Sequence, residues 1–316
     1  MDREPTTESP TDLRGRSWLA VLRRTVSEFS EDNLTDWAAA LTYYAVLAIF
    51  PALIVMVSVL GLIGESATKP LLDNLSSVAP GPANDILTSA IKDIQGSQGA
   101  AGVFFVVGLL AAVWSASGYI GAFMRASNAI YDIDEGRPIW KTLPLRVGLT
   151  VLLMVLTAVS AIGVTLSGGL AEQAGNVVGV GDTAVQIWNI AKWPVLLLFV
   201  SFMFAVLYWA APNVKQPGFR WITPGGVLAV LGWVIASIAF AFYVGNFGSY
   251  NKTYGALAGP IVFLVWLWIS NLMILLGAEF NAELERGRAI EQGMRPEDTE
   301  PFVEPRDTRK IEANQS

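Results

Sequence analysis

The sequence predicts an all-α protein that crosses a membrane six times, with both termini in the cytosol. The first observation is its composition, because 53% of the 316 residues are apolar and 15% are charged, whereas a soluble domain usually carries about 25% charged residues. The second is the placement of the charges, which leaves six uncharged runs of 22 to 31 residues. The third is the uneven distribution of Lys and Arg between those runs.

Each uncharged run is long enough to be a membrane-spanning helix. A helix of about 20 apolar residues crosses the roughly 30 Å hydrocarbon core of a bilayer. Six soluble-core helices of this length, all without a charge, would be exceptional. Trimmed to their apolar parts, the runs predict spans near residues 41–63, 102–124, 147–168, 192–211, 224–246 and 256–279.

The positive charges predict the orientation of these spans, because cytosolic loops are enriched in Lys and Arg. The N-terminal segment, the 125–146 loop, the 212–223 loop and the C-terminal tail together carry 17 Lys and Arg residues, and the three alternate loops carry 4. We therefore expect a multi-pass protein of the bacterial cytoplasmic (inner) membrane with its N and C termini in the cytosol.

The predicted organisation has three parts: a cytosolic N-terminal segment (1–36), a six-helix membrane domain (37–282) and a charged cytosolic C-terminal tail (283–316). Apolar residues such as Trp18, Leu22 and Val26 recur at helical spacing in the first part. They predict an amphipathic helix, which either lies at the membrane interface or docks on the protein's own loops. The tail continues the last span as a charged helix, and the prolines beyond Gly293 predict that most of it is disordered.

The chain contains no His and no Cys, which excludes histidine bases, thiolate nucleophiles and the usual zinc ligands. No motif for a cofactor or a metal ion is evident, and we expect none to be bound. The net charge of −6 does not favour a nucleic-acid partner. The protein is therefore expected to have no enzymatic activity.

Three charged residues mark the predicted cytosolic boundary of the membrane: Asp36 before the first span, Arg125 after the second and Glu279 at the end of the sixth. No charge lies deep inside a span, where ion-coupled transporters often place one. The three boundary charges are candidates for one ionic cluster. It would be either an inner gate or a helix-end salt bridge.

Other candidate positions are polar or break the helical pattern. Pro51 lies near the centre of the first span, where it predicts either a hinge that lines a cavity or a fixed kink. Asn271 lies inside the sixth span and needs a hydrogen-bond partner in hydrocarbon. Asn213 and Tyr254 are expected near the ends of spans.

Several segments resemble one known family in the same order along the chain. They are AAALTYYAVLAIFPALI (38–54), Asn128 to Tyr131 followed by Arg137, APNV (211–214), PGG (224–226) with Trp233, and YGALAGPIVFLVWLWISNLMILLGAEFNAELER (254–286). Together they resemble the YihY/virulence factor BrkB family of bacterial inner-membrane proteins. The resemblance covers roughly residues 30–286. It implies six helices in the cytoplasmic membrane and a role in exporting lipid-like envelope components, beside a ribonuclease label that is thought mistaken.

The resemblance and the residues together favour a transporter or flippase of a lipid-like or amphiphilic envelope component. Its partners would be membrane lipids and a lipid-like solute. The alternative is a non-catalytic scaffold of the cell envelope that binds partners through its tails. A ribonuclease is disfavoured, because the chain has no His and its predicted cytosolic face mixes 17 basic with 21 acidic residues.

Overall fold

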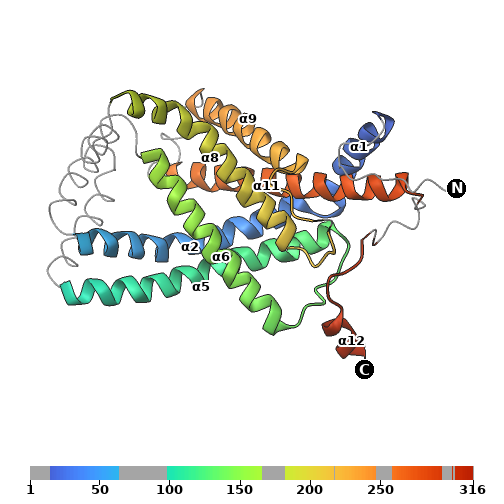
Figure 1. Cartoon of the computed structure of the whole chain (residues 1–316), viewed down its shortest axis with the longest axis horizontal. Coiled ribbons are helices and arrows are strands. Elements are labelled where there is room, and N and C mark those ends of the chain that lie inside the picture. Colours follow the sequence, from blue (N-terminus) through green and yellow to red (C-terminus); the bar gives the residue numbers. More distant parts are fainter. Residues whose placement is uncertain are drawn as a thin grey trace. The chain divides into compact units, whose positions relative to one another are not determined.

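The computed structural model describes residues 15–63, 98–165, 182–216, 218–246, 258–293, 301 and 303–315 (Figure 1). Within these ranges the secondary structure is helical, apart from one isolated bridge between Val214 and Pro305. Six helices of the described chain are long and apolar enough to cross a membrane, as the sequence predicts. They are α2 (Leu34–Ile63), α5 (Gln98–Ile130), α6 (Ile139–Thr165), α8 (Asp182–Ala210), α9 (Pro224–Asn246) and α11 (Ala258–Glu291).

The last of these helices is much longer than a membrane crossing needs. At 1.5 Å per residue, the 34 residues of α11 span about 51 Å, against roughly 30 Å of hydrocarbon. Its final turns, from Gly277 to Gly287, are largely buried within the protein. They form the charged helical continuation that the sequence predicts.

The chain divides into two compact units, residues 43–119 and the remainder. In the first unit α2 runs through Pro51 without interruption. The Gly108 backbone lies against the Ile54 side chain, and Gly118 lies against the Tyr44 ring. Small residues thus allow close contact between α2 and α5 within this unit.

In the other unit α9 and α11 approach so closely that only glycine fits where they meet. A Cβ atom on Gly277 would overlap the carbonyl oxygen of Gly225 and would lie 2.6 Å from the Tyr208 hydroxyl. That hydroxyl donates a hydrogen bond to the Ile274 carbonyl at 2.8 Å. The indole of Trp233 also donates to the Ser270 hydroxyl at 3.0 Å, which ties α9 to α11.

The N-terminal helix α1 (Gly15–Glu31) packs on the extension of α11. Val21 is buried with Phe280 and Leu284, and Trp18 packs against this group. Leu19, Leu22 and Val26 lie on another face of α1 and are 71%, 48% and 72% exposed. The helix thus docks on another helix and not on loops, and it keeps a second apolar face exposed.

The α9–α11 contact gives a first prediction. Replacing Gly277 with Ala should force the two helices apart and destabilise the protein by about 1–3 kcal/mol, the usual cost of overpacking a tight contact. The measurement is the thermal unfolding midpoint of purified protein in detergent. Gly148→Ala in α6 is the control, because a Cβ there meets no atom within 4 Å. Equal midpoints for the two variants would contradict the tight contact.

Candidate functional site

Polar contacts join five segments to one another: the end of α5, the 131–138 loop, the 211–223 loop, the extension of α11, and α1. Asn128 bonds to the 211–223 loop, Tyr131 bonds to both that loop and α11, and α1 forms ion pairs with α11. The candidate functional site lies in this region. It consists of a polar cluster, a charged cluster and a cavity.

The polar cluster consists of Asn128, Glu135, Arg137 and Asn213. Arg137 is buried and donates two hydrogen bonds to the Glu135 carboxylate, each 2.7 Å long. It also donates to the Ala211 carbonyl at 2.8 Å. The Asn128 side chain donates to Glu135 at 3.0 Å and accepts from the Asn213 backbone N–H at 2.7 Å. Three residues named from the sequence, Asn128, Arg137 and Asn213, therefore meet in the structure.

These contacts set the charge of Glu135. Burial by itself would raise the pKa of its carboxyl group, but hydrogen bonds from Arg137 and Asn128 outweigh burial and lower the pKa below its usual value. Glu135 is therefore ionised at neutral pH. The cluster fixes the two loops to each other through a buried, charge-assisted network.

A C-terminal strap, residues 303–315, crosses this cluster. The Asn213 side chain forms two hydrogen bonds with the backbone of Asp307. It donates to the Asp307 carbonyl at 2.8 Å and accepts from the Asp307 N–H at 3.1 Å. Asp307 also forms 2.7 Å ion pairs with Lys141 and Arg309, which hold the pKa of its carboxyl group well below the usual value. The strap ends in the short helix α12 (Arg309–Gln315).

The strap lies within residues 283–316, the tail for which the sequence predicts disorder. Prolines and dense charge make the segment look unstructured in isolation, but its partners elsewhere in the chain lie at least 89 residues away. Gly136 illustrates why the docking is close: a Cβ atom at this position would overlap the Asp307 carbonyl, and the Gly136 carbonyl accepts from the Lys310 N–H at 2.9 Å.

The charged cluster lies between α1 and α11. Glu283 is 2% exposed and accepts hydrogen bonds from Arg24 of α1 and from Arg286 one turn along α11. Arg286 also pairs with Glu28 of α1 at 2.9 Å. The charges of two arginines and two glutamates thus neutralise one another, whereas a single buried charge without a partner would be costly.

Among the described residues, no ion pair joins the three boundary charges named from the sequence. Asp36 lies in the first turn of α2 and Arg125 near the end of α5, and both are exposed. Glu279 is buried, at 1% exposed, and hydrogen-bonds with Asp32 in the turn before α2. The partner of Glu279 is therefore an acid one helical turn before Asp36.

Three further sequence candidates have different outcomes. Asn271 is buried inside α11, and its side-chain amide donates to the Thr42 hydroxyl at 3.0 Å, which gives the polar group a partner. Tyr254 lies outside the described residues. Pro51 belongs to the other compact unit.

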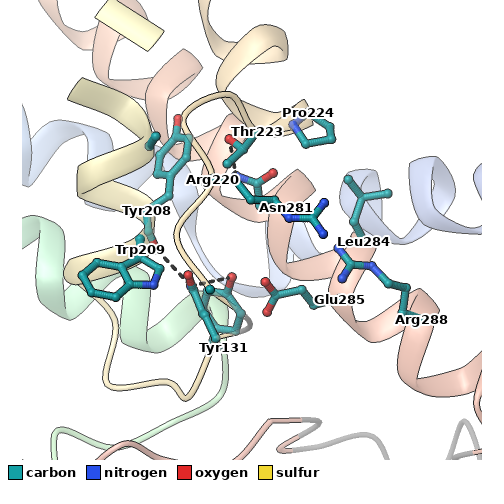
Figure 2. Close-up of a pocket in the computed structure, with 13 residues that line it drawn as sticks. Tyr131, Tyr208, Trp209, Arg220, Thr223, Pro224, Asn281, Leu284, Glu285 and Arg288 are labelled. Atoms are coloured by element: carbon teal, nitrogen blue, oxygen red, sulfur yellow. Dashed lines mark hydrogen bonds between the residues drawn. The ribbon is translucent and has the colours of Figure 1, made fainter. Parts of the chain in front are cut away.

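The cavity opens beside these clusters and has a volume of about 50 Å³. Figure 2 shows Tyr131, Arg220, Glu285 and Arg288 around it, with the aromatic ring of Trp209 on one side. Gln216 donates to the Tyr131 hydroxyl at 3.2 Å, and this hydroxyl also hydrogen-bonds with Glu285. Burial, together with the carboxylates of Glu285 and Glu279, raises the pKa of Tyr131 well above its usual value, so the phenol stays neutral.

The start of α9 forms another wall of the cavity. Thr223 caps the helix by accepting from the Gly226 N–H at 3.0 Å. Asn281 of α11 accepts from the Gly225 N–H at 2.8 Å and donates to the Thr223 hydroxyl at 3.1 Å. The cavity therefore combines charged, neutral polar and aromatic side chains.

The cavity residues are not among the sites that the sequence predicts. A usable signal exists within α11, because Asn281, Glu285 and Arg288 are spaced four and three residues apart and therefore share one helix face. The other walls come from loops, from α8 and from the start of α9. Their contribution depends on contacts between segments that are distant in sequence.

Comparisons with known proteins agree with this architecture. The sequence profile of the virulence factor BrkB family matches residues 25–301. YfkH of Bacillus subtilis, which is named only as ribonuclease-like, is 30% identical over 86% of this chain and 98% of its own length. UPF0761 membrane proteins of Alkalilimnicola ehrlichii and Alcanivorax borkumensis are 32% and 30% identical, and the alignments span 60% and 61% of those longer chains. No solved structure matches the chain.

The polar cluster gives a second prediction. Arg137→Gln should destabilise the protein by about 3–5 kcal/mol, because it leaves Glu135 and two backbone carbonyls without their buried donor. Arg125→Gln removes an exposed arginine and should change stability by less than about 0.5 kcal/mol. The thermal unfolding midpoints of the two variants in detergent measure the difference. A stable Arg137→Gln variant would show that the cluster is dispensable.

The strap gives a third prediction. Asn213→Ala removes both side-chain contacts to Asp307 and should release the strap, so that trypsin cuts faster after Arg306, Arg309 and Lys310. Lys215→Ala loses only an exposed pair with Glu304 and should have little effect. Peptide mapping of timed digests distinguishes the two. Rapid cleavage of the wild-type strap would contradict its docking.

Proposed function

The chain belongs to the virulence factor BrkB family, and we propose that it moves a lipid-like or amphiphilic component of the cell envelope across the membrane or between its leaflets. It is a multi-pass membrane protein. The observation that carries the proposal is the cavity beside the ends of α8, α9 and α11. Its lining suits a molecule with both a charged and an apolar part.

The chemistry of the lining supports this class of substrate. Arg220 and Arg288 offer positive charge and multiple donors for an anionic headgroup. Tyr131, Gln216 and Asn281 add neutral hydrogen-bonding groups, while aromatic rings suit the region where a headgroup meets its hydrocarbon part.

The size of the cavity bears on mechanism. A volume of about 50 Å³ accommodates roughly four water molecules and no complete amphiphile. Transport therefore requires the walls to move apart. The 216–223 loop and the ends of the helices are the segments that would move, and the strap holds the neighbouring 213–215 segment.

We propose that this end of the protein faces the cytosol and that the membrane is the bacterial cytoplasmic membrane. The four segments richest in Lys and Arg are N-terminal, 125–146, 212–223 and C-terminal. Their described parts contact one another, so that they share one side. The excess of positive charge on that side supports its assignment to the cytosol. The exposed apolar face of α1 supports a position of this helix at the membrane interface on the same side.

We also propose that the protein has no catalytic activity and requires no cofactor. A ribonuclease-like name for one relative does not change this, because a chain without His lacks the usual general base for cleaving RNA. Membrane lipids are the proposed partners. A non-catalytic scaffold of the cell envelope remains the alternative.

The test reconstitutes purified protein into vesicles of phosphatidylethanolamine and phosphatidylglycerol that contain a fluorescent phosphatidylglycerol. Dithionite added outside quenches only the outer leaflet, so that movement of lipid appears as additional loss of fluorescence. We expect wild-type protein to increase this loss above protein-free vesicles. The double variant Arg220→Gln/Arg288→Gln should reduce the rate at least tenfold, because it removes both cavity cations.

Arg309→Gln is the matched control, since its exposed arginine lies outside the cavity. Wild-type flux equal to that of protein-free vesicles, for both phospholipids in labelled form, would contradict the proposal and favour the scaffold. Equal rates for the double variant and the control would exclude the cavity as the path.

A further inference from the structure

Asp32 and Glu279 form a pair of acids at the joint between α1, α2 and α11. Glu279 is 1% exposed and follows the apolar part of α11 directly. Asp32 occupies the turn between α1 and α2, where Asn33 adopts a left-handed conformation with φ of 53°. The two carboxyl groups hydrogen-bond each other. A hydrogen bond between two carboxyl groups requires a proton on one of them, because an ionised carboxylate only accepts.

The positive charges nearby are engaged with other acids. Arg24 pairs with Glu283, and Arg286 pairs with both Glu28 and Glu283. The groups that face the pair are instead acidic or neutral. They are Glu28 and Glu31 of α1, Asp132 and Tyr131 after α5, and Glu283 of α11.

A second observation points to the same ligand. The Oε2 atom of Glu279 is buried and has no hydrogen-bond partner among the described residues. A buried ionised oxygen without a donor is strongly disfavoured, whereas a protonated carboxyl group is tolerated. Within the described part of the chain, no three acidic side chains are arranged to hold a metal ion.

We propose that Asp32 and Glu279 form a proton-binding site that holds α1 against α11. With a proton shared between the acids, one negative charge is removed and the hydrogen bond closes the joint. Loss of that proton places two carboxylates side by side next to Glu28, Glu31 and Asp132, and their repulsion loosens α1. This site goes beyond the proposed transport function and is tested without any substrate.

The second proton of the pair binds in the physiological range. Burial raises the pKa of Asp32 to about 6, with the hydrogen bond from Glu279 opposing and the neighbouring acids adding to the increase. The folded protein thus binds more protons than the unfolded chain, in which Asp has a pKa of about 3.9. Stability should therefore fall as the pH rises from about 4 to above 6.

The experiment is infrared difference spectroscopy of purified, lipid-reconstituted protein titrated with pH. Wild-type protein is expected to show the carbonyl stretch of a protonated carboxyl group at neutral pH. Glu279→Gln, which keeps a neutral side chain of the same size, should lose this band. Asp32→Asn should remove the second titration near pH 6, and the matched control Asp36→Asn should keep both signals because Asp36 is exposed.

Thermal unfolding midpoints keep the proposal testable if a band is obscured. Between pH 5 and 8 the wild-type midpoint should fall, whereas that of Asp32→Asn should change less, because this variant lacks the carboxyl group that titrates in this range. A protonated-carboxyl band of unchanged intensity in Glu279→Gln would overturn the proposal. Identical pH profiles for wild type, Asp32→Asn and Asp36→Asn would overturn it as well.

Discussion

The buried carboxylate of Glu283 is the group on which the packing between α1 and α11 depends. It is 2% exposed, and leaving such a charge without partners costs several kcal/mol. Arg24 must therefore come from α1, and Arg286 from the next turn of α11. The apolar contact of Val21 with Phe280 and Leu284 forms beside this charge network and excludes water from it. The longest helix of the described chain is thereby tied to the N-terminal segment.

The same constraint extends along α11. Glu279, Glu283 and Glu285 face three different partners: Asp32, the two arginines and Tyr131. Apart from Arg286, which belongs to α11 itself, every partner comes from a segment that connects or precedes membrane helices. Burying several acids on one helix therefore fixes the turn after α1 and the loop after α5. The cavity lies within this framework and takes its charged residues from α11 and from the 211–223 loop.

Much of the fold could be predicted from the sequence, because six long uncharged apolar runs are best explained as six helices that cross a bilayer. The charged continuation of α11 also followed from its composition. The pairing of Glu279 did not, because Asp32 and Asp36 lie one helical turn apart and the sequence shows no sign of the turn at Asn33. Arg125 lies on the exposed face of α5 between buried neighbours, and no single-span pattern reveals this.

The polar cluster could likewise be predicted only in part from the sequence. Asn128 and Arg137 were named through the family resemblance, and Asn213 also from its place near the end of a span. The three do meet, but their partners include backbone groups of distant segments. The strap escaped prediction for this reason. Its order depends on Asn213 and Gly136 rather than on its own sequence, and it lies entirely beyond the residues that the family profile matches.

A double-mutant cycle between Arg24 and Glu283 tests the central claim most directly. The unfolding midpoints of wild type, Arg24→Gln, Glu283→Gln and the double variant would be measured in the same detergent. If the buried pair holds α1 on α11, each single change lowers the midpoint clearly, and the double variant is less destabilised than the sum of the two. Strictly additive effects would contradict the account, because they would mean that the two side chains do not interact.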